Sequence, residues 1–238
     1  MDWPQKCAAV IPCFNEAKSV VELITSARRH LSTVIVVDDG STDSTAALAA
    51  SAGGIVVRHR LNAGKGAALR TGWKHARHCG FTWALTMDGD GQHSPEDIPA
   101  FFERAENTGA SLVIGNRLDN PAGMPWLRRK VNYWMTRRIE KMAGVRVADS
   151  QCGFRLINLD RLSKLQLSTD HFEVESEMLL AFARAGFRIE FVPIEVIYDT
   201  ETSKIHPLID TWRWLRWWLA QPAPAASPLR AWRTMRVP

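Results

Sequence analysis

The chain has few cysteines and no long apolar run. Cys7, Cys13, Cys79 and Cys152 lack the spacing of a metal site, which predicts reduced thiols in a cytosolic protein. No apolar run reaches the roughly 18–20 residues that cross a bilayer as a helix. The N-terminus has no basic region followed by an apolar stretch, and the chain has no internal repeat. Neither a membrane span nor a secretory signal is therefore predicted.

The composition is that of a folded globular protein. The 238 residues are 46% apolar and 23% charged, with 15 Gly and 12 Pro. These values exclude a collagen, a disulfide-stapled mini-protein and a disordered tail. The length suits one large α/β domain with a sizeable core.

Acidic residues are scarce at the C-terminal end. Between Lys204 and Pro238 there are six basic residues and one acid, Asp210, together with five of the ten tryptophans. This segment alone carries a net charge of +5, the value for the whole chain. A basic, tryptophan-rich segment is typical of contact with an anionic surface, either a membrane or a nucleic acid. Composition does not choose between these two partners.

Apolar runs alternate with helix-like segments along the first half of the chain. The runs are nearly continuous and too short for helices, which favours strands. Strands are predicted at Cys7–Phe14, Thr33–Asp38, Ile55–Arg58 and Thr82–Met87, and helices at Glu16–His30, Asp43–Ala52, Gly66–Cys79 and Pro95–Asn107. This order predicts an α/β fold whose mostly parallel sheet is flanked by helices on both faces. Ligands of such sheets bind at the carboxyl ends of the strands.

The second half is less regular. Further strands are predicted at Ser111–Gly115, Gly153–Ile157 and Phe187–Val196, and further helices at Leu127–Met142, Glu173–Ala185 and Leu208–Leu219. Residues 1–207 are expected to form the main domain. Residues 208–238 are expected to form an amphipathic helix followed by a proline-rich, irregular tail.

Carboxylates follow two of the predicted strands. Asp38 and Asp39 could accept hydrogen bonds from a nucleobase or ribose, or could form an ordinary turn and helix cap. Asp88 and Asp90, two residues apart between glycines, suit Mg²⁺ or Mn²⁺, with Gln92 as a neutral oxygen ligand. The alternative for this second pair is a solvated loop.

Basic residues lie beside glycine turns. Lys65, in Asn62-Ala-Gly-Lys-Gly66, precedes a predicted helix, where backbone amides favour an anion. The alternative is a glycine turn with a surface lysine. Arg117, Arg155 and Lys204 are candidates for phosphate contacts, although isolated basic residues are usually solvated or paired with surface acids.

Taken together and in order, these motifs resemble the family 2 glycosyltransferases of the nucleotide-sugar-binding GT-A fold. The nearest branch is the dolichyl- or polyprenyl-phosphate sugar synthases, and the resemblance covers roughly residues 7–205. The motifs are Val10-Ile-Pro-Cys-Phe-Asn-Glu16, Val36-Val-Asp-Asp-Gly-Ser-Thr-Asp43, Asn62-Ala-Gly-Lys-Gly66, Met87-Asp-Gly-Asp-Gly-Gln-His93, Gly115-Asn-Arg117 and Asp149–Arg155.

The resemblance implies a role for each matching residue. Asp90 is implied as the direct metal ligand, beside Asp88 and Gln92. Arg117, Arg155 and Lys204 are implied as phosphate contacts, Lys204 on a loop that closes over the diphosphate. The implied nucleoside pocket contains Pro12, Phe14, Glu16, Asp38 and Asp39, with Asp39 at the base imide. The implied donor is a UDP- or GDP-sugar, and the implied reaction is a direct displacement with inversion.

The acceptor is predicted from a missing signature. Sugar-to-sugar members of the family carry Glu-Asp followed by Gln-x-x-Arg-Trp, which is absent around Phe172-Glu-Val-Glu-Ser-Glu-Met178. A polyprenyl phosphate acceptor is therefore favoured. The alternatives are a hydroxyl acceptor, with Glu175 or Glu177 as its base, and a nucleotide sensor without turnover; no nucleic acid partner is expected.

The expected location is the cytoplasmic face of a membrane. The predicted helix Leu208–Leu219 places Leu208, Trp212, Leu215 and Leu219 on one face, broadened by Trp214, Trp217 and Trp218. Tryptophan is favoured at the depth of lipid headgroups. The alternative is packing of these tryptophans on the body or in a dimer, and the sequence does not indicate the oligomeric state.

Overall fold

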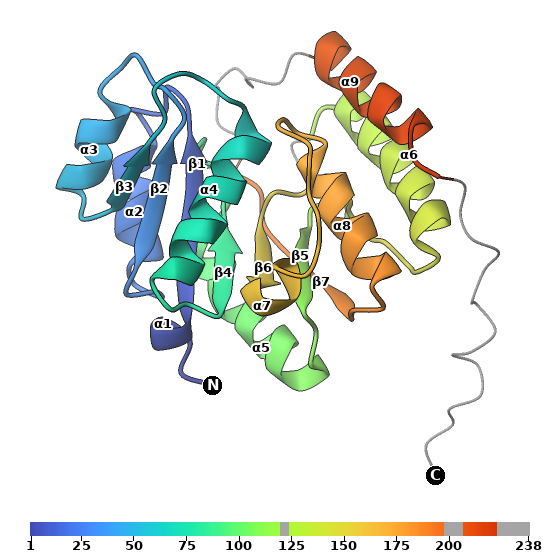
Figure 1. Cartoon of the computed structure of the whole chain (residues 1–238), viewed down its shortest axis with the longest axis horizontal. Helices are drawn as coiled ribbons and strands as arrows, with labels where there is room; N and C mark the ends of the chain where they lie inside the picture. The colour runs from blue at the N-terminus through green and yellow to red at the C-terminus, as the bar shows by residue number, and fades with distance from the viewer. Residues whose placement is uncertain (120–123, 198–206, 223–238) are drawn as a thin grey trace.

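The computed structural model describes residues 1–119, 124–197 and 207–222 of the chain (Figure 1). Its elements are, in order, α1 (Trp3–Lys6), β1 (Cys7–Cys13), α2 (Val20–Ala27), β2 (Val34–Asp38), α3 (Thr45–Ser51), β3 (Ile55–Arg58), α4 (Lys65–His78), β4 (Trp83–Thr86), η1 (Pro95–Asp97), α5 (Ile98–Thr108), β5 (Leu112–Asn116), α6 (Trp126–Ala143), β6 (Arg155–Asn158), α7 (Leu159–Leu162), α8 (Val174–Arg184), β7 (Ile189–Pro193) and α9 (Pro207–Leu219).

One seven-stranded sheet organises the molecule, in the order β3-β2-β1-β4-β6-β5-β7. Neighbouring strands are parallel except β6, which runs antiparallel to both β4 and β5. The predicted α/β fold with a mostly parallel sheet is confirmed. The antiparallel strand was not predicted, because a short apolar run carries no information on strand direction.

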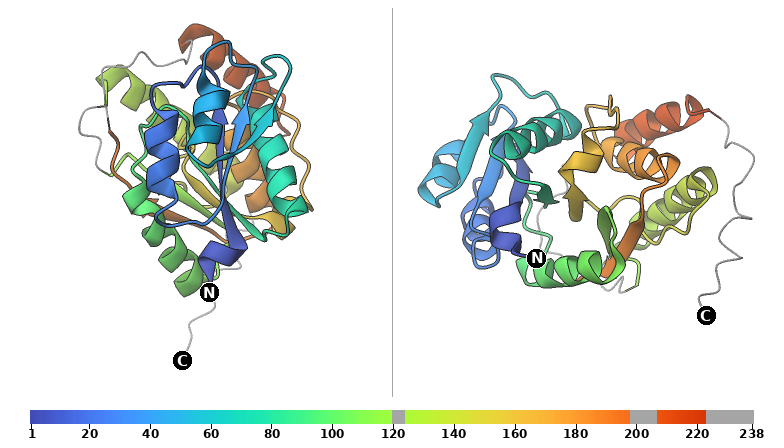
Figure 2. Two further views of the ribbon diagram at one scale, coloured as in Figure 1. Left: turned by 90° about the vertical axis from the view of Figure 1, so that its left-hand side faces the viewer. Right: turned by 60° about the horizontal axis from the view of Figure 1, so that its bottom comes forward.

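Helices cover both faces of the sheet. α4 and α8 lie on one face, and α2 and α5 lie on the other (Figure 2). The central strands are therefore buried on both sides, and their residues alternate between two apolar environments rather than between core and water. This burial explains why the strands read as continuous apolar runs.

The C-terminal helix α9 lies beside α6 and α8 (Figure 1). Trp214 is only 2% exposed, and Trp217 and Trp218 pack against the core. The prediction of an interfacial position was therefore wrong for Trp214, because neighbouring helices cover it. Trp217 and Trp218 are half-buried, and their contact with lipid stays a prediction. Trp212 and Leu219, from the predicted apolar face, are exposed. No helix within the described ranges is long and apolar enough to cross a membrane.

Candidate active site

Loops at the carboxyl ends of β1 and β2 form the predicted nucleoside end of the site. Phe14 is exposed, whereas Glu16 is buried and Pro12 is half-buried. Asn15, between them, has φ 55°, a left-handed conformation that an asparagine tolerates. Its Oδ1 accepts a hydrogen bond from the Thr42 N–H at 2.8 Å, which joins the two loops.

The two carboxylates after β2 hold these loops in place. Asp39 accepts hydrogen bonds from the N–H groups of Ala63 and Gly64, at 3.0 and 2.8 Å, and lies 2.7 Å from His59 Nδ1. Asp38 accepts one from the Ser41 N–H and pairs with Arg58 at 3.0 Å. Asp39 thus fixes the loop that leads into α4, a role that the motif alone does not reveal. Its contact with a nucleobase stays a prediction.

Lys65 is the centre of a charged cluster. Its Nζ lies 2.6 Å from Asp88 Oδ1 and 2.5 Å from Glu175 Oε1. Burial alone would lower the pKa of Lys65, but the two carboxylates together raise it above its usual value. Burial would raise the pKa of Asp88, but Lys65 and its other basic neighbours lower it. Lys65 and Asp88 are therefore both charged at neutral pH. The sequence associates Lys65 only with an anion, but in the structure it pairs with two carboxylates.

The loop after β4 brings Asp88 and Asp90 to the same edge of the sheet. Asp90 Oδ1 accepts a hydrogen bond from the Gln92 N–H at 3.1 Å, and the Asp88 N–H points to His93 Nδ1 at 3.3 Å. Gly153 leaves room for the Asp88 carboxylate, because a Cβ at that position would lie 2.4 Å from its Oδ1. A side chain at position 153 would fill this cradle.

This donor set suits a hard divalent cation. It consists of carboxylates and an amide oxygen, the groups that Mg²⁺ and Mn²⁺ prefer. Within the described residues, no three His, Cys, Asp or Glu side chains form a closed cluster that could hold a metal by themselves. Mg²⁺ is often bound by only one or two protein carboxylates, and substrate phosphates supply the remaining ligands. The residues present therefore fit a cation that binds together with a diphosphate.

The two predicted phosphate-binding arginines are buried. Arg117 pairs with Asp149 through Nε and Nη2, at 2.8 and 3.1 Å, and is 6% exposed. Arg155 donates from all three guanidinium nitrogens to the carbonyls of Cys152, Glu175 and Ser150, and is 1% exposed. Backbone carbonyls thus engage three of the five N–H donors of Arg155, and its direct phosphate contact stays a prediction. The same contact stays a prediction for Arg117.

The two candidate bases differ in their surroundings. Glu175 is buried against Lys65, whereas Glu177 accepts hydrogen bonds from the backbone and hydroxyl groups of both Ser168 and Thr169. Those two residues belong to the loop that also contains Asp170. The Asp170 carbonyl accepts a hydrogen bond from the Gly66 N–H at the start of α4. Glu177 thus stabilises a loop. Lys204, the predicted diphosphate contact, lies outside the described residues.

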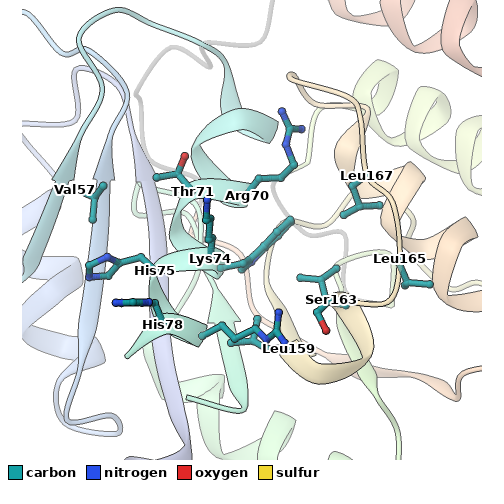
Figure 3. Close-up of a pocket in the computed structure, with 13 residues that line it drawn as sticks. Val57, Arg70, Thr71, Lys74, His75, His78, Leu159, Ser163, Leu165 and Leu167 are labelled. Carbon is teal, nitrogen blue, oxygen red and sulfur yellow. The ribbon is translucent and has the colours of Figure 1, made fainter. Parts of the chain in front are cut away.

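A separate hollow of about 940 Å³ lies beside α4 (Figure 3). Basic residues of α4, among them Lys74 and His78, and leucines of α7 and the loop after it line this hollow. No predicted site residue contributes to it. The charged cluster at the sheet edge, rather than this hollow, is therefore the candidate active site.

Comparisons with known proteins identify the family. The α/β fold with its mostly parallel sheet is of the GT-A type. Residues 8–165, more than half of the chain, match "Glycosyl transferase family 2". The chain therefore belongs to glycosyltransferase family 2 and is a glycosyltransferase.

Two relatives are named as enzymes of dolichyl-phosphate and polyprenol-phosphate sugars. The UDP-N-acetylglucosamine–dolichyl-phosphate N-acetylglucosaminyltransferase of Methanococcus voltae is 31% identical over 217 residues, covering 82% of this chain and 86% of the relative. The polyprenol monophosphomannose synthase of Mycolicibacterium smegmatis is 31% identical over 206 residues, covering 80% of this chain and 77% of the relative. The predicted resemblance to this branch is confirmed.

A solved structure has the same fold. Glucosyl-3-phosphoglycerate synthase of Mycobacterium tuberculosis, in complex with Mn²⁺, UDP and phosphoglyceric acid, matches with a TM-score of 0.67 and 22% sequence identity. The match covers 90% of this chain and 76% of that chain. At this level of identity, the similarity supports the GT-A type of fold.

Proposed function

We propose that this enzyme transfers a sugar from a nucleoside-diphosphate sugar to a polyprenyl phosphate at an anionic membrane surface. The observation that carries the proposal is an exposed aromatic and basic face on α6 and α9, next to the helix that bears Glu175. The two relatives named for dolichyl and polyprenyl phosphate products support the same acceptor class.

The face combines apolar and cationic side chains, and we call it the α6–α9 face. Exposed apolar residues on it are Trp126, Leu127, Tyr133, Trp134, Ile209, Trp212 and Leu219. Exposed basic residues on it include Arg129, Lys130, Arg137 and Arg216. Aromatic rings and basic groups on one surface are favoured at the depth of anionic lipid headgroups. The buried side of α9 is joined to the first turn of α8, which carries Glu175, by the hydrogen bond from Trp214 to Ser176.

The donor end of the reaction depends on charge. Asp90, with Asp88 and Gln92 beside it, would hold Mg²⁺ or Mn²⁺, and the cation would withdraw charge from the donor diphosphate. The Mycobacterium tuberculosis enzyme, whose solved complex contains Mn²⁺ and UDP, supports this assignment. Lys65 is fixed and charged at the same edge of the sheet, where it stabilises the negative charge that grows on the leaving diphosphate.

The transfer itself is a single displacement. A phosphate oxygen of the acceptor forms a bond to the anomeric carbon as the bond from that carbon to the diphosphate oxygen breaks. The nucleoside diphosphate leaves with the bonding electron pair, and the configuration at the anomeric carbon inverts. A lipid phosphate is already ionised near pH 7, so no base is needed. This agrees with the pairing of Glu175 to Lys65 and the use of Glu177 within a loop.

The test is a release assay with the full chain. UDP- and GDP-sugars are offered with Mn²⁺, with or without a short-chain polyprenyl phosphate, and the nucleoside diphosphate and lipid product are quantified. We expect release that requires both the metal and the lipid phosphate, and a product whose mass is that of a glycosylated polyprenyl phosphate. Transfer to the matching polyprenol or to phosphoglyceric acid, with none to polyprenyl phosphate, would contradict the proposal.

A further inference from the structure

The C-terminal helix α9 contacts the candidate active site through one hydrogen bond. Trp214 of α9 donates from Nε1 to Ser176 Oγ at 2.9 Å. Ser176 is fully buried and directly follows Glu175 in the first turn of α8. We infer that Trp214 is a positioning residue, which holds Glu175 against Lys65 through Ser176. This inference rests on the proposed function, since it assigns Lys65 to the donor diphosphate.

Ser176 is also tied to the loop before β6. Its Oγ accepts a second hydrogen bond, from Gln151 Nε2 at 2.9 Å, and the same nitrogen contacts Ser150 Oγ at 2.8 Å. Ser150 Oγ lies in turn 3.1 Å from the Thr136 hydroxyl of α6. The first turn of α8 is therefore connected to both helices of the α6–α9 face by buried polar contacts. Such networks fix one arrangement because each buried polar group that loses its partner costs free energy.

Glu175 is held on both sides of its own backbone. Arg155 Nη1 donates to the Glu175 carbonyl at 2.6 Å, while Trp214 fixes the residue that follows. With the backbone fixed, the Glu175 carboxylate stays 2.5 Å from Lys65 Nζ, which is 2.6 Å from Asp88. Loss of the Trp214 N–H leaves Ser176 without one of its two donors, so the first turn of α8 becomes free to shift. Lys65 then has a less defined position for the donor diphosphate.

Trp218 provides a matched control. Its ring is stacked on that of Trp214, with 6.2 Å between the centroids and 3° between the planes. Its Nε1 is buried but has no hydrogen-bond partner among the described residues. Trp218→Phe removes the same atoms from the same cluster as Trp214→Phe, without removing a hydrogen bond to α8.

The experiment compares Trp214→Phe, Ser176→Ala, the double variant and Trp218→Phe. We expect Trp214→Phe and Ser176→Ala each to raise the donor KM about three- to tenfold, the scale of one lost hydrogen bond, with kcat changed less than about twofold. The double variant should be no worse than the more affected single variant, because both remove the same contact. Trp218→Phe should leave the donor KM unchanged.

A second measurement does not require turnover. The lysines are labelled as ¹³C-dimethyl derivatives, and the Lys65 resonance is assigned with Lys65→Arg. We expect this resonance to move in Trp214→Phe and Ser176→Ala and to stay in place in Trp218→Phe. Equal effects of the two tryptophan variants would assign Trp214 to packing alone and overturn the inference, as would an unmoved Lys65 resonance. If no donor is turned over by the unaltered enzyme, the proposed function fails while the resonance still decides the positioning role.

Discussion

Lys65 makes ion pairs with Asp88 and Glu175, while Asp90 contacts its own loop through the Gln92 N–H. The two acids of the Asp-x-Asp motif thus have different surroundings. Asp88 pairs with a lysine on α4, whereas Asp90 accepts a hydrogen bond from its own loop, and both side chains are half-buried. This difference leads to the first prediction for a single residue.

We expect Asp90→Asn to lower kcat/KM by roughly 10²-fold or more, the scale for loss of a group that stabilises transition-state charge. Asparagine keeps the oxygen that accepts the Gln92 N–H, so the loop and the melting temperature should be preserved. The measurement is turnover against Mn²⁺ concentration, with the exposed Asp160→Asn on α7 as control. Near-normal activity with normal metal stimulation in Asp90→Asn would contradict the metal assignment.

The two glutamates of α8 give a second prediction. With a phosphate acceptor, Glu175→Gln and Glu177→Gln should each lower kcat less than about tenfold, whereas loss of a general base costs about 10²–10⁴-fold. Glu177→Gln should also lower the melting temperature, because one of its two oxygens that accept from Ser168 and Thr169 is lost. A kcat loss of several orders of magnitude in either variant would instead indicate a hydroxyl acceptor.

For single residues, the sequence predicts which of them lie together in the site but not the direction in which each side chain points. Asp88, Lys65 and Glu175 meet because strand ends and helix starts share one edge of the sheet. The direction of the Arg155 guanidinium depends on carbonyls of the loop just before β6 and on one carbonyl of α8. The distinction between Glu175 and Glu177 depends on a loop packed against α4, which no local pattern reports.

Among the elements, α9 separates into a buried and an exposed side. Trp214 faces α8 and α6, whereas Ile209, Trp212 and Leu219 are exposed. The predicted helix was correct in extent, but helical periodicity could not tell which tryptophans are covered. The segment is apolar almost all round, so the side that packs is decided by α6 and α8.

This division predicts which side chains of α9 bind lipid. Replacing Trp212 and Leu219 together by Ser should abolish sedimentation with liposomes of anionic phospholipid, because each buries apolar surface at the interface. The melting temperature should not change, since both side chains are exposed. The matched control is Trp217→Ser, a half-buried position that packs against the core. Unchanged liposome binding in the double variant would remove α9 from the membrane contact.

For the whole molecule, a buried ion pair links stability to pH. Burial alone would raise the pKa of Asp149, but the Arg117 guanidinium beside it lowers that pKa. In the unfolded chain the pKa of this carboxyl is about 3.9, so the unfolded state binds more protons as the pH falls through this range. The stabilisation from the pair is therefore complete above about pH 4 and is lost below it.

We expect the free energy of unfolding, measured with urea, to decrease as the pH is lowered below about 4. The double variant Arg117→Met with Asp149→Leu should make this decrease at low pH (the acid limb) less steep. The control, Glu140→Gln in a surface pair with Arg137, should leave the acid limb unchanged. Either single change at the buried pair should cost about 3–5 kcal/mol, because the remaining charge loses its partner. An acid limb that the double variant leaves as steep as before would show that other groups control it.

The order of the whole sheet could be predicted only in part. Alternating strands and helices indicate the parallel half formed by β1 to β4. The crossovers through α2 and α3 join neighbouring strands, whereas α4 leads from β3 to β4, which pairs with β1. The position of β6 between β4 and β5 depends on the long segment from Asn116 to Arg155, which includes α6. The sequence of that segment contains no pattern that predicts which strands β6 will pair with.

The place of β6 has a consequence for synthesis on the ribosome. A nascent chain that has emerged only to residue 150 contains β4 and β5 but not the strand that joins them. β4 then has one open edge and β5 has two, and open edges invite pairing with other chains. We expect stalled chains to gain protease resistance over β1 to β4 first, and over β5 only after Asn158 has emerged, when the two halves of the sheet become one.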